Sequence, residues 1–150
     1  MLPKFARNEP IKAVYWMLRQ MVRNRALIEQ ANIKIYFRHM HRDYGRMYYY
    51  PDRYVIVIQP NLSRKETFRI LAHETIHVAQ YVTGKIREVK SGKKTKVFWK
   101  RKKFFDDKNI EDKLSRTEYF ALPWEQEAYK MERKLSALYL ENHNVERIFP

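Results

Sequence analysis

Residues 63–84 read SRKETFRILAHETIHVAQYVTG, and this stretch carries the strongest structural signal in the chain. Ser63 followed by Glu66 has the form of a capping box, which marks the beginning of a helix. Apolar and small residues then recur every three or four positions and form one helical stripe: Phe68, Leu71, Ala72, Thr75, Ile76 and Ala79. Gly84 is the residue type most often found just beyond a helix end. The stretch therefore predicts a helix between Ser63 and Gly84 with one face in the core.

Within this helix, residues 73–77 have the pattern His-Glu-x-x-His. Residues four apart lie above one another on a helix, so the imidazoles of His73 and His77 can reach one metal ion from the same face. Glu74 lies beside them, where it can take a proton from a water molecule on that metal. The pattern predicts a catalytic Zn²⁺ site with the two histidines as ligands and Glu74 as general base. The alternative, two histidines four apart by accident, is disfavoured by the helix around them and by the glutamate between them.

A catalytic zinc has three protein ligands and leaves a fourth position for water. Residues 122–128 offer Glu125 and Glu127 near the start of another helix, with a proline in its first turn. Helical spacing puts Glu127 on the face expected to point inward, with Trp124, Met131, Leu135 and Leu138. It puts Glu125 on the polar face, with Glu132 and Ser136. Because a carboxylate on an apolar face needs a partner, we expect Glu127 to be the third ligand. Glu125 and His143 stay open as alternatives.

Three segments before the motif have strand-like composition: 32–37, 46–50 and 54–58. Pro51-Asp52-Arg53 is a turn between the last two. We expect a small, mainly antiparallel sheet that leads into the motif helix, with most of its aromatic side chains in the core. Further upstream, Asn8-Glu9-Pro10 begins a packing helix whose apolar stripe extends to about Val22.

The two motifs together make the chain resemble a known group of enzymes. His-Glu-x-x-His at 73–77, followed by Pro-Trp-Glu-x-Glu-Ala at 123–128, is similar to small single-domain zincins of the SprT-like and ImmA/IrrE-type metallopeptidases, particularly versions carried by bacteriophages. The resemblance covers roughly residues 32–134. It implies a minimal gluzincin-like domain in which a short sheet precedes the motif helix and a glutamate on a later helix completes the zinc site. SprT-like members proper use a third histidine, and His143 is the only one downstream.

The fold class expected from these segments is α+β: an N-terminal helix, a small sheet, the motif helix, a basic hairpin and a C-terminal helix. A chain of 150 residues without repeats or low-complexity linkers predicts a single domain over 1–150. It has no cysteine and therefore no disulfide or thiolate metal site. No apolar run is long enough to span a membrane, so we expect no membrane association and a cytoplasmic location, including that of a phage-infected host.

Positive charge is the second strong feature of the sequence. The formal net charge is +14, which predicts attraction to polyanions. The excess concentrates in one stretch, which contains a single acid, Glu88: Lys85, Arg87, Lys90, Lys93, Lys94, Lys96, Lys100, Arg101, Lys102 and Lys103. Residues 86–90 and 95–99 are expected to form a hairpin around the turn at 91–94. Phe98, Trp99, Phe104 and Phe105 would add stacking surfaces, so the hairpin is a candidate for contact with nucleic acid. A solvated surface, or an acidic protein substrate, would explain the same charge.

Three functional hypotheses follow from the sequence. The first is a zinc peptidase that acts on a protein or peptide substrate, in which Glu74 passes the proton of the attacking water to the leaving amine. Tyr119, Tyr129 and His143 are candidates for the donor to the oxyanion. The second is a basic DNA- or RNA-binding protein in which the zinc site is structural or vestigial. The third is a structural or interaction protein with a fortuitous motif.

Overall fold

The structure is a computed structural model, and it describes residues 5–143. Its elements follow one another along the chain in this order: α1 (Glu9–Met21), α2 (Arg25–Gln30), β1 (Ile33–Phe37), β2 (Gly45–Tyr50), β3 (Arg53–Ile58), α3 (Arg64–Val82), β4 (Ile86–Ser91), β5 (Lys94–Trp99), β6 (Lys102–Phe105), the 3-10 helix η1 (Lys108–Lys113), α4 (Arg116–Phe120) and α5 (Pro123–Asn142). This is the α+β class that the sequence predicts. None of the helices in the described part has the length and apolar character needed to cross a bilayer.

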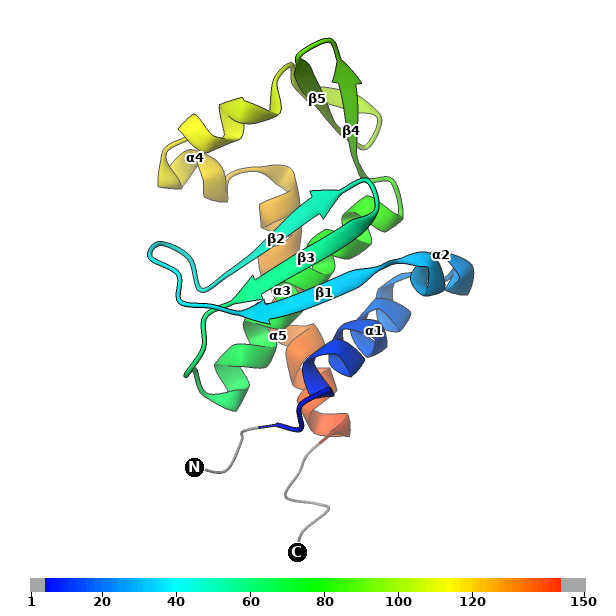
Figure 1. Ribbon diagram of the computed structural model, residues 1–150, viewed down its shortest axis with the longest axis vertical. Helices are drawn as coiled ribbons and strands as arrows, with labels where there is room; N and C mark the ends of the chain where they lie inside the picture. The colour runs from blue at the N-terminus through cyan, green and yellow to red at the C-terminus, as the bar shows by residue number, and fades with distance from the viewer. Residues whose placement is uncertain (1–4, 144–150) are drawn as a thin grey trace, which may run out of the picture.

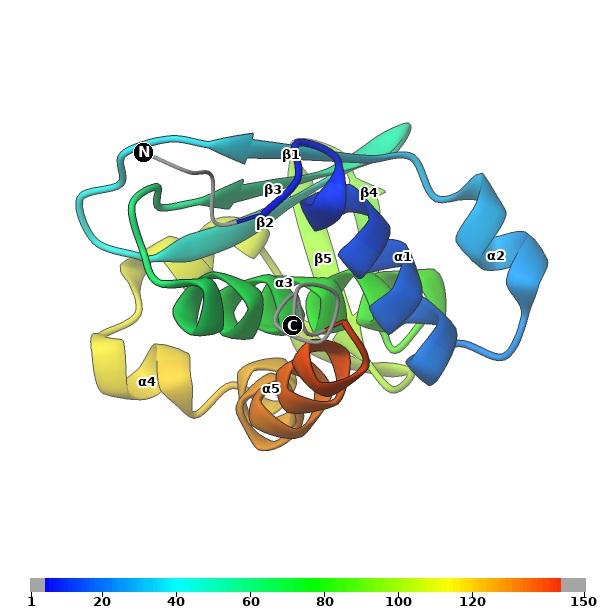
Figure 2. The ribbon, with the colours of Figure 1, turned by 90° about the horizontal axis from the view of Figure 1, so that it is seen from below.

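The first sheet has the order β1-β3-β2 and forms one outer layer of the molecule (Figures 1 and 2). β1 pairs with β3 in parallel, with Ile35 opposite Ile56, whereas β2 pairs with β3 antiparallel, with Met47 opposite Ile56. Alternation along the strands turns these three residues toward the helices. The antiparallel pairing of β2 with β3 agrees with the mainly antiparallel sheet expected from the sequence, whereas the parallel pairing of β1 with β3 makes this sheet mixed.

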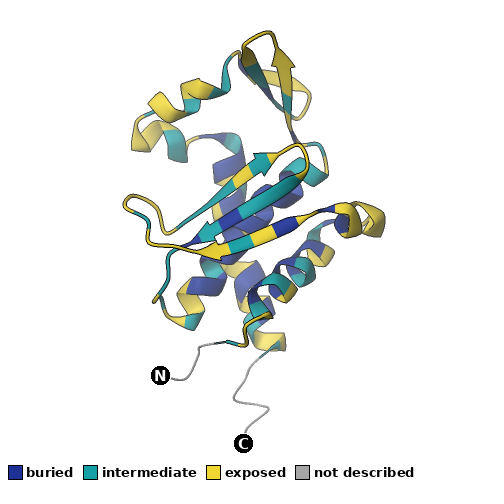
Figure 3. Ribbon diagram, in the orientation of Figure 1, coloured by how far each residue is buried: buried dark blue, intermediate teal, exposed yellow. Residues whose placement is uncertain are grey.

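The main core lies between this sheet and the helices α1, α3 and α5 (Figure 2). Its largest fully buried side chains include Met17 and Leu18 from α1, Ile56 from β3, and Phe68 and Leu71 from α3. Helix α3 lies between the sheet and α5, so every residue from Ile70 to Gln80 is buried. The burial colouring shows this central position (Figure 3). Polar residues of α3 in this stretch must therefore find partners on neighbouring elements, because unpaired buried polar groups are costly.

Helix α3 begins as the sequence predicts. Ser63 is the N-cap, and its Oγ accepts a hydrogen bond of 3.1 Å from the backbone N–H of Glu66. The helix ends at Val82, and Gly84 follows in the left-handed region at φ +79°, which suits glycine. The start of α1 at Glu9 and the first-turn Pro123 of α5 also agree with the sequence.

The second sheet, β4-β5-β6, projects from one end of the molecule beyond the first sheet (Figure 1). Both of its pairings are antiparallel, and Gly92 in the β4–β5 turn has φ +64°. The sheet packs on a second apolar cluster that includes Val97, Phe105, Leu122 and Trp124. The hairpin is confirmed, whereas β6, η1, α2 and α4 were not expected.

Candidate metal centre

Two histidines of α3 and one glutamate of α5 meet at a single point. His73 Nε2 lies 3.2 Å from His77 Nε2. Glu125 reaches both, with Oε1 at 3.1 Å from His73 Nε2 and Oε2 at 2.7 Å from His77 Nε2. All three side chains are buried, with exposed fractions of 8% for His73, 7% for His77 and 2% for Glu125. Among residues 5–143, this is the one cluster of histidine and acidic side chains with the geometry of a metal site.

The other ring nitrogen of each histidine faces an oxygen atom. His77 Nδ1 is 2.8 Å from Gln80 Oε1, and His73 Nδ1 is 3.5 Å from Glu132 Oε1. An amide oxygen accepts hydrogen bonds only, so the proton of neutral His77 belongs on Nδ1, and the Nε2 lone pair points at the cluster. Outer partners of this kind hold a ligand histidine in the tautomer that binds metal.

The donor set fits a zinc ion. Ligand atoms about 2.0–2.2 Å from a tetrahedral zinc lie about 3.3–3.6 Å from one another, and Zn²⁺ favours imidazole nitrogen and carboxylate oxygen. Two of the three observed separations are close to this range. The third, between His77 and Glu125, has the length of a hydrogen bond, so a small shift of the Glu125 side chain is needed to admit the ion. The pairing of an anionic carboxylate with two imidazoles also suits a cation between them.

Electrostatics in the cluster favour the ionised carboxylate. Burial alone would raise the pKa of Glu125, but the charge of His77 and hydrogen bonds with both histidines lower it to about 2. Burial would lower the pKa of His73, but its interactions with Glu125 and Glu132 raise it to about 10. The carboxylate of Glu125 also occupies the first turn of α5, where the helix dipole favours a negative charge. Without a metal ion, the anionic Glu125 carboxylate thus pairs with protonated histidine, and a cation that enters the site would displace that proton.

The expected orientation of α5 is wrong. Glu127 was expected to face inward and Glu125 to lie on the polar side, yet Glu125, Glu132 and Ser136 are buried, and Glu127 is partly exposed. Met131 and Leu138, which were expected inside, are exposed. The reason is that α5 packs on α3, and the polar stripe of α5 finds partners there: His73, His77 and Arg69. It is thus Glu125, not Glu127, that the structure places against the two histidines.

Glu127 does not contact the two histidines directly but is linked to His77 through Gln80. Its Oε1 accepts a hydrogen bond of 3.1 Å from Gln80 Nε2, and its Oε2 accepts one of 2.9 Å from Lys85. Gln80 also donates to the backbone oxygen of Trp124 at 3.0 Å. These two bonds fix the Gln80 amide so that its oxygen faces His77. Nothing in the sequence marks Gln80 as part of the site, because a glutamine within a helix belongs to no motif.

Glu74 is next to the cluster and is buried, with an exposed fraction of 5%. Burial raises its pKa, and the nearby charges of His77 and His73 oppose this rise. Within residues 5–143 no hydrogen bond holds its carboxylate, so both oxygen atoms are available to water or substrate. The neighbouring strand is β2, where the absence of a side chain at Gly45 leaves room: an added Cβ would lie 2.4 Å from Ile70 Cγ2 and 3.5 Å from Glu74 Cγ.

Two tyrosine hydroxyls are near the same carboxylates. The ring of Tyr129 lies 4.7 Å from that of His73. Burial, followed by the charges of Glu125 and Glu74, raises the pKa of Tyr119, so this phenol keeps its proton. Tyr119 belongs to α4, and Glu111 of η1 is also close enough for its charge to interact with those of Glu125 and His77. An ion pair of 3.6 Å between Arg46 of β2 and Asp112 joins η1 to the first sheet.

The remaining histidines are away from the cluster. His143 follows the end of α5, about 27 Å along the helix from Glu125, and its ring stacks on that of Tyr139. His39 and His41 pack on each other after β1, and His39 contacts Gln59 at 2.9 Å. None of the three contributes to the donor set, so the alternative of a third histidine ligand does not agree with the geometry.

Residues 28–97 match a family model, the IrrE N-terminal-like domain of the Peptidase_M78 family. The match contains the first sheet, the whole of α3 and most of the β4–β5 hairpin, whereas Glu125 and the rest of α5 lie beyond it. It supports an ImmA/IrrE-type metallopeptidase domain in this part of the chain. Of the two families that the motifs resemble, the ImmA/IrrE-type is thus the one that the match confirms. No curated protein and no solved structure matches the chain.

Proposed function

We propose that this protein is a zinc-dependent metallopeptidase in which His73, His77 and Glu125 hold the metal. The observation that carries the proposal is the convergence of three buried ligand atoms while Gln80 and Glu132 face the outer histidine nitrogens. A structural zinc would call for four protein ligands. The cluster in the described chain has three, which agrees with the open position of a catalytic site.

A metal ion held there would lower the pKa of a bound water molecule and polarise a substrate carbonyl. Glu74 has the role of general base, since its carboxylate is beside the histidines, its pKa is raised, and no hydrogen bond from the described part of the chain restrains it. It accepts the proton of the attacking water and transfers it to the nitrogen of the leaving amine. Tyr119 and Tyr129 keep their protons and are the candidate donors to the oxygen of the tetrahedral intermediate.

Metal analysis tests the ligand set. We expect about one zinc per chain in the purified protein, and the same content in Glu127→Gln. The variants His73→Ala and Glu125→Ala are expected to lose the metal, since each removes one of three ligands. Glu127→Gln is the matched control because it alters an acid on the same helix, two residues away. Retention of full zinc by Glu125→Ala together with its loss from Glu127→Gln would overturn the assignment.

Peptide hydrolysis is tested separately with a peptide library derived from a whole proteome, read by mass spectrometry. Such a library offers every local sequence, so the test does not depend on knowing the substrate. New termini should appear with the zinc-loaded protein and should be absent with Glu74→Gln, which keeps the metal but has no base. Equal cleavage by Glu74→Gln, or none by the zinc-loaded protein, contradicts the peptidase.

A further inference from the structure

The face of the first sheet that points away from α3 is exposed. The long helices α1, α3 and α5 lie on the other side of this sheet, and within residues 5–143 no helix covers the outer side (Figures 1 and 2). Tyrosines are exposed there, with fractions of 43% for Tyr36 and 40% each for Tyr48 and Tyr50. From the sequence alone, most of these aromatic residues are expected in the core. An exposed array of large aromatic side chains on a sheet is a sign of a binding surface.

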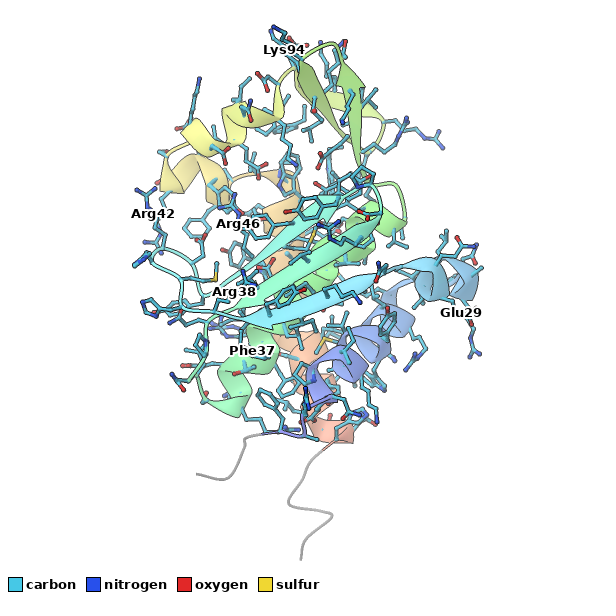
Figure 4. The ribbon with its side chains drawn as sticks, viewed as in Figure 1. Glu29, Phe37, Arg38, Arg42, Arg46 and Lys94 are labelled. Carbon is cyan, nitrogen blue, oxygen red and sulfur yellow. The ribbon has the colours of Figure 1, made fainter. Side chains whose placement is uncertain are left out.

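Each of the three tyrosines is paired with an arginine on the same face. The distances from guanidinium carbon to ring centroid are 4.9 Å for Arg38 and Tyr36, 5.7 Å for Arg46 and Tyr48, and 4.4 Å for Arg53 and Tyr50. These six residues, together with Lys34, Val55 and Val57 between them, are called the open face below. Figure 4 shows Arg38 and Arg46 on the side of the sheet that faces the viewer.

The strand register distributes aromatic and positive side chains evenly over the open face. Neighbouring strands place the following residues in rows across the sheet: Tyr36, Val57 and Arg46; Lys34, Val55 and Tyr48; Arg53 and Tyr50. Each row thus contains one tyrosine and at least one cation. Along β2, Tyr48 and Tyr50 are separated by about 6.7 Å of strand, roughly twice the rise of about 3.4 Å between neighbouring nucleotides in a stacked strand.

The charge on this face is positive and only partly compensated. Arg53 pairs with Asp52 at 2.9 Å, and Arg46 lies 3.7 Å from Asp43 and 3.6 Å from Asp112 of η1. Arg38 and Lys34 form no ion pair with any carboxylate of residues 5–143. Because the chain as a whole carries +14, the open face attracts an anion and has little acidic charge of its own to repel one.

We infer that the open face binds single-stranded nucleic acid, with bases stacking on Tyr36, Tyr48 and Tyr50 and phosphates contacting the arginines. Sheets that carry aromatic rings recognise single strands in this way, and arginine adds both charge and a planar stacking surface. A duplex has its bases already stacked and offers only phosphates to such a surface. An acidic protein would use the arginines but would leave the tyrosine array without a role.

The basic hairpin of residues 85–103 is less suited to bind single-stranded nucleic acid by base stacking. The second sheet offers fewer rings to a ligand: Phe105 is buried, and Trp99 is partly buried against Trp124 with ring centroids 6.1 Å apart. Phe104 is exposed, although its ring also contacts Trp124 at 5.1 Å. Lys94 lies at the far tip of the hairpin (Figure 4). The hairpin therefore contributes long-range attraction, whereas the open face provides the stacking contacts.

Binding is tested by fluorescence anisotropy with labelled oligo(dT), oligo(rU) and a DNA duplex of equal length at low salt. Both single strands are expected to bind more tightly than the duplex, and the difference between the two strands separates DNA from RNA as the preferred source. Replacing Tyr48 and Tyr50 with leucine should weaken single-strand binding by about tenfold or more. Phe104→Leu, which removes an exposed ring of the second sheet, is the control and should change it little.

Two variants of equal charge distinguish the surfaces. Lys34→Gln with Arg38→Gln alters the open face, and Lys90→Gln with Lys93→Gln alters the hairpin. The first pair should lower single-strand affinity clearly more than the second. The inference is overturned if no binding of single strands is detected or if the duplex binds more tightly. It is also overturned if both double variants lose the same affinity and the tyrosine changes have no effect. Circular dichroism verifies that each variant is folded, and His73→Ala should bind nucleic acid normally, which makes the result independent of the metal centre.

Discussion

Gln80 connects the metal centre to the charged surface at the level of single residues. Its amide oxygen faces His77 Nδ1, while its amide nitrogen donates to Glu127, which in turn pairs with Lys85. The proton of His77 is thereby kept on Nδ1, and Nε2 is left as the donor for a metal. This places Gln80 as a positioning residue that touches neither metal nor substrate.

Gln80→Met should therefore weaken zinc binding by about 10–100-fold while the volume of the side chain is nearly conserved. The measurement is a competition titration against a chelator of known affinity. The double variant Gln80→Glu with Glu127→Gln exchanges the two groups and restores an acceptor for His77, so its affinity should return toward that of the wild type. Unchanged zinc affinity in Gln80→Met would show that Gln80 only fills space.

Gly45 makes a second prediction at this scale. A Cβ at this position would lie 2.4 Å from Ile70 Cγ2, so Gly45→Ala forces β2 and α3 apart beside Glu74. Overpacking of this kind should lower the free energy of unfolding by about 1–3 kcal/mol. Urea denaturation measures it. If the close contact is the cause, Gly45→Ala will lower the free energy of unfolding less in a protein that also carries Ile70→Ala. Additive effects of the two changes would contradict this explanation.

At the scale of elements, Glu9 and Arg64 join the beginnings of α1 and α3 to the end of α5. Arg64 makes two hydrogen bonds to the Glu9 carboxylate at 2.6 Å and 2.9 Å, and the Tyr139 hydroxyl donates a third at 2.6 Å. Burial would raise the pKa of Glu9, but these hydrogen bonds and the charge of Arg64 lower it below its ordinary value of 4.5. The folded state thus holds the ionised carboxylate.

A lowered pKa in the folded state gives the sign of the pH dependence. The stabilisation from Glu9 is present above pH 4.5 and is lost as the pH falls through the lower pKa of the folded state, because the unfolded chain then takes up the proton first. Glu9→Gln should cost about 1–3 kcal/mol near neutral pH and less in acid. Urea denaturation at several pH values measures this. A constant difference between the two proteins from neutral to acid pH would rule out the ionised contact as the cause.

The elements differ in how well the sequence predicted them, and the difference has a physical cause. Local signals were sufficient for α3, because the Ser63 cap, the apolar spacing and Gly84 all act within the segment. The orientation of α5 was predicted wrongly, because its buried face depends on partners from another element. Glu125 and Glu132 are buried only since His73 and Arg69 of α3 lie opposite them. The pattern in α5 alone would place these acids in solvent. Likewise, nothing in β1 indicates that it pairs in parallel with β3 or that the tyrosines of β2 remain exposed.

At the scale of the whole molecule, the three proposed metal ligands come from parts of the chain that are distant in sequence. His73 and His77 belong to the central helix α3, whereas Glu125 begins α5, which follows the second sheet and α4. A zinc ion bound by all three would therefore crosslink α3 to α5 in the folded state only. A ligand that binds the folded state alone stabilises it by mass action, by about 4 kcal/mol when its free concentration is about a thousand times Kd.

Removal of the metal should accordingly lower the melting temperature of the protein. For a chain of this length, a loss of about 4 kcal/mol corresponds to a decrease on the order of 10 °C, measured by differential scanning calorimetry with and without a strong chelator. Glu127→Gln should show the same decrease, because it keeps the three ligands. Glu125→Ala should melt at one temperature whether or not chelator is present. A melting temperature of the zinc-loaded protein that chelator does not change would mean that the ion is bound elsewhere or does not bridge α3 and α5, and would contradict the ligand set.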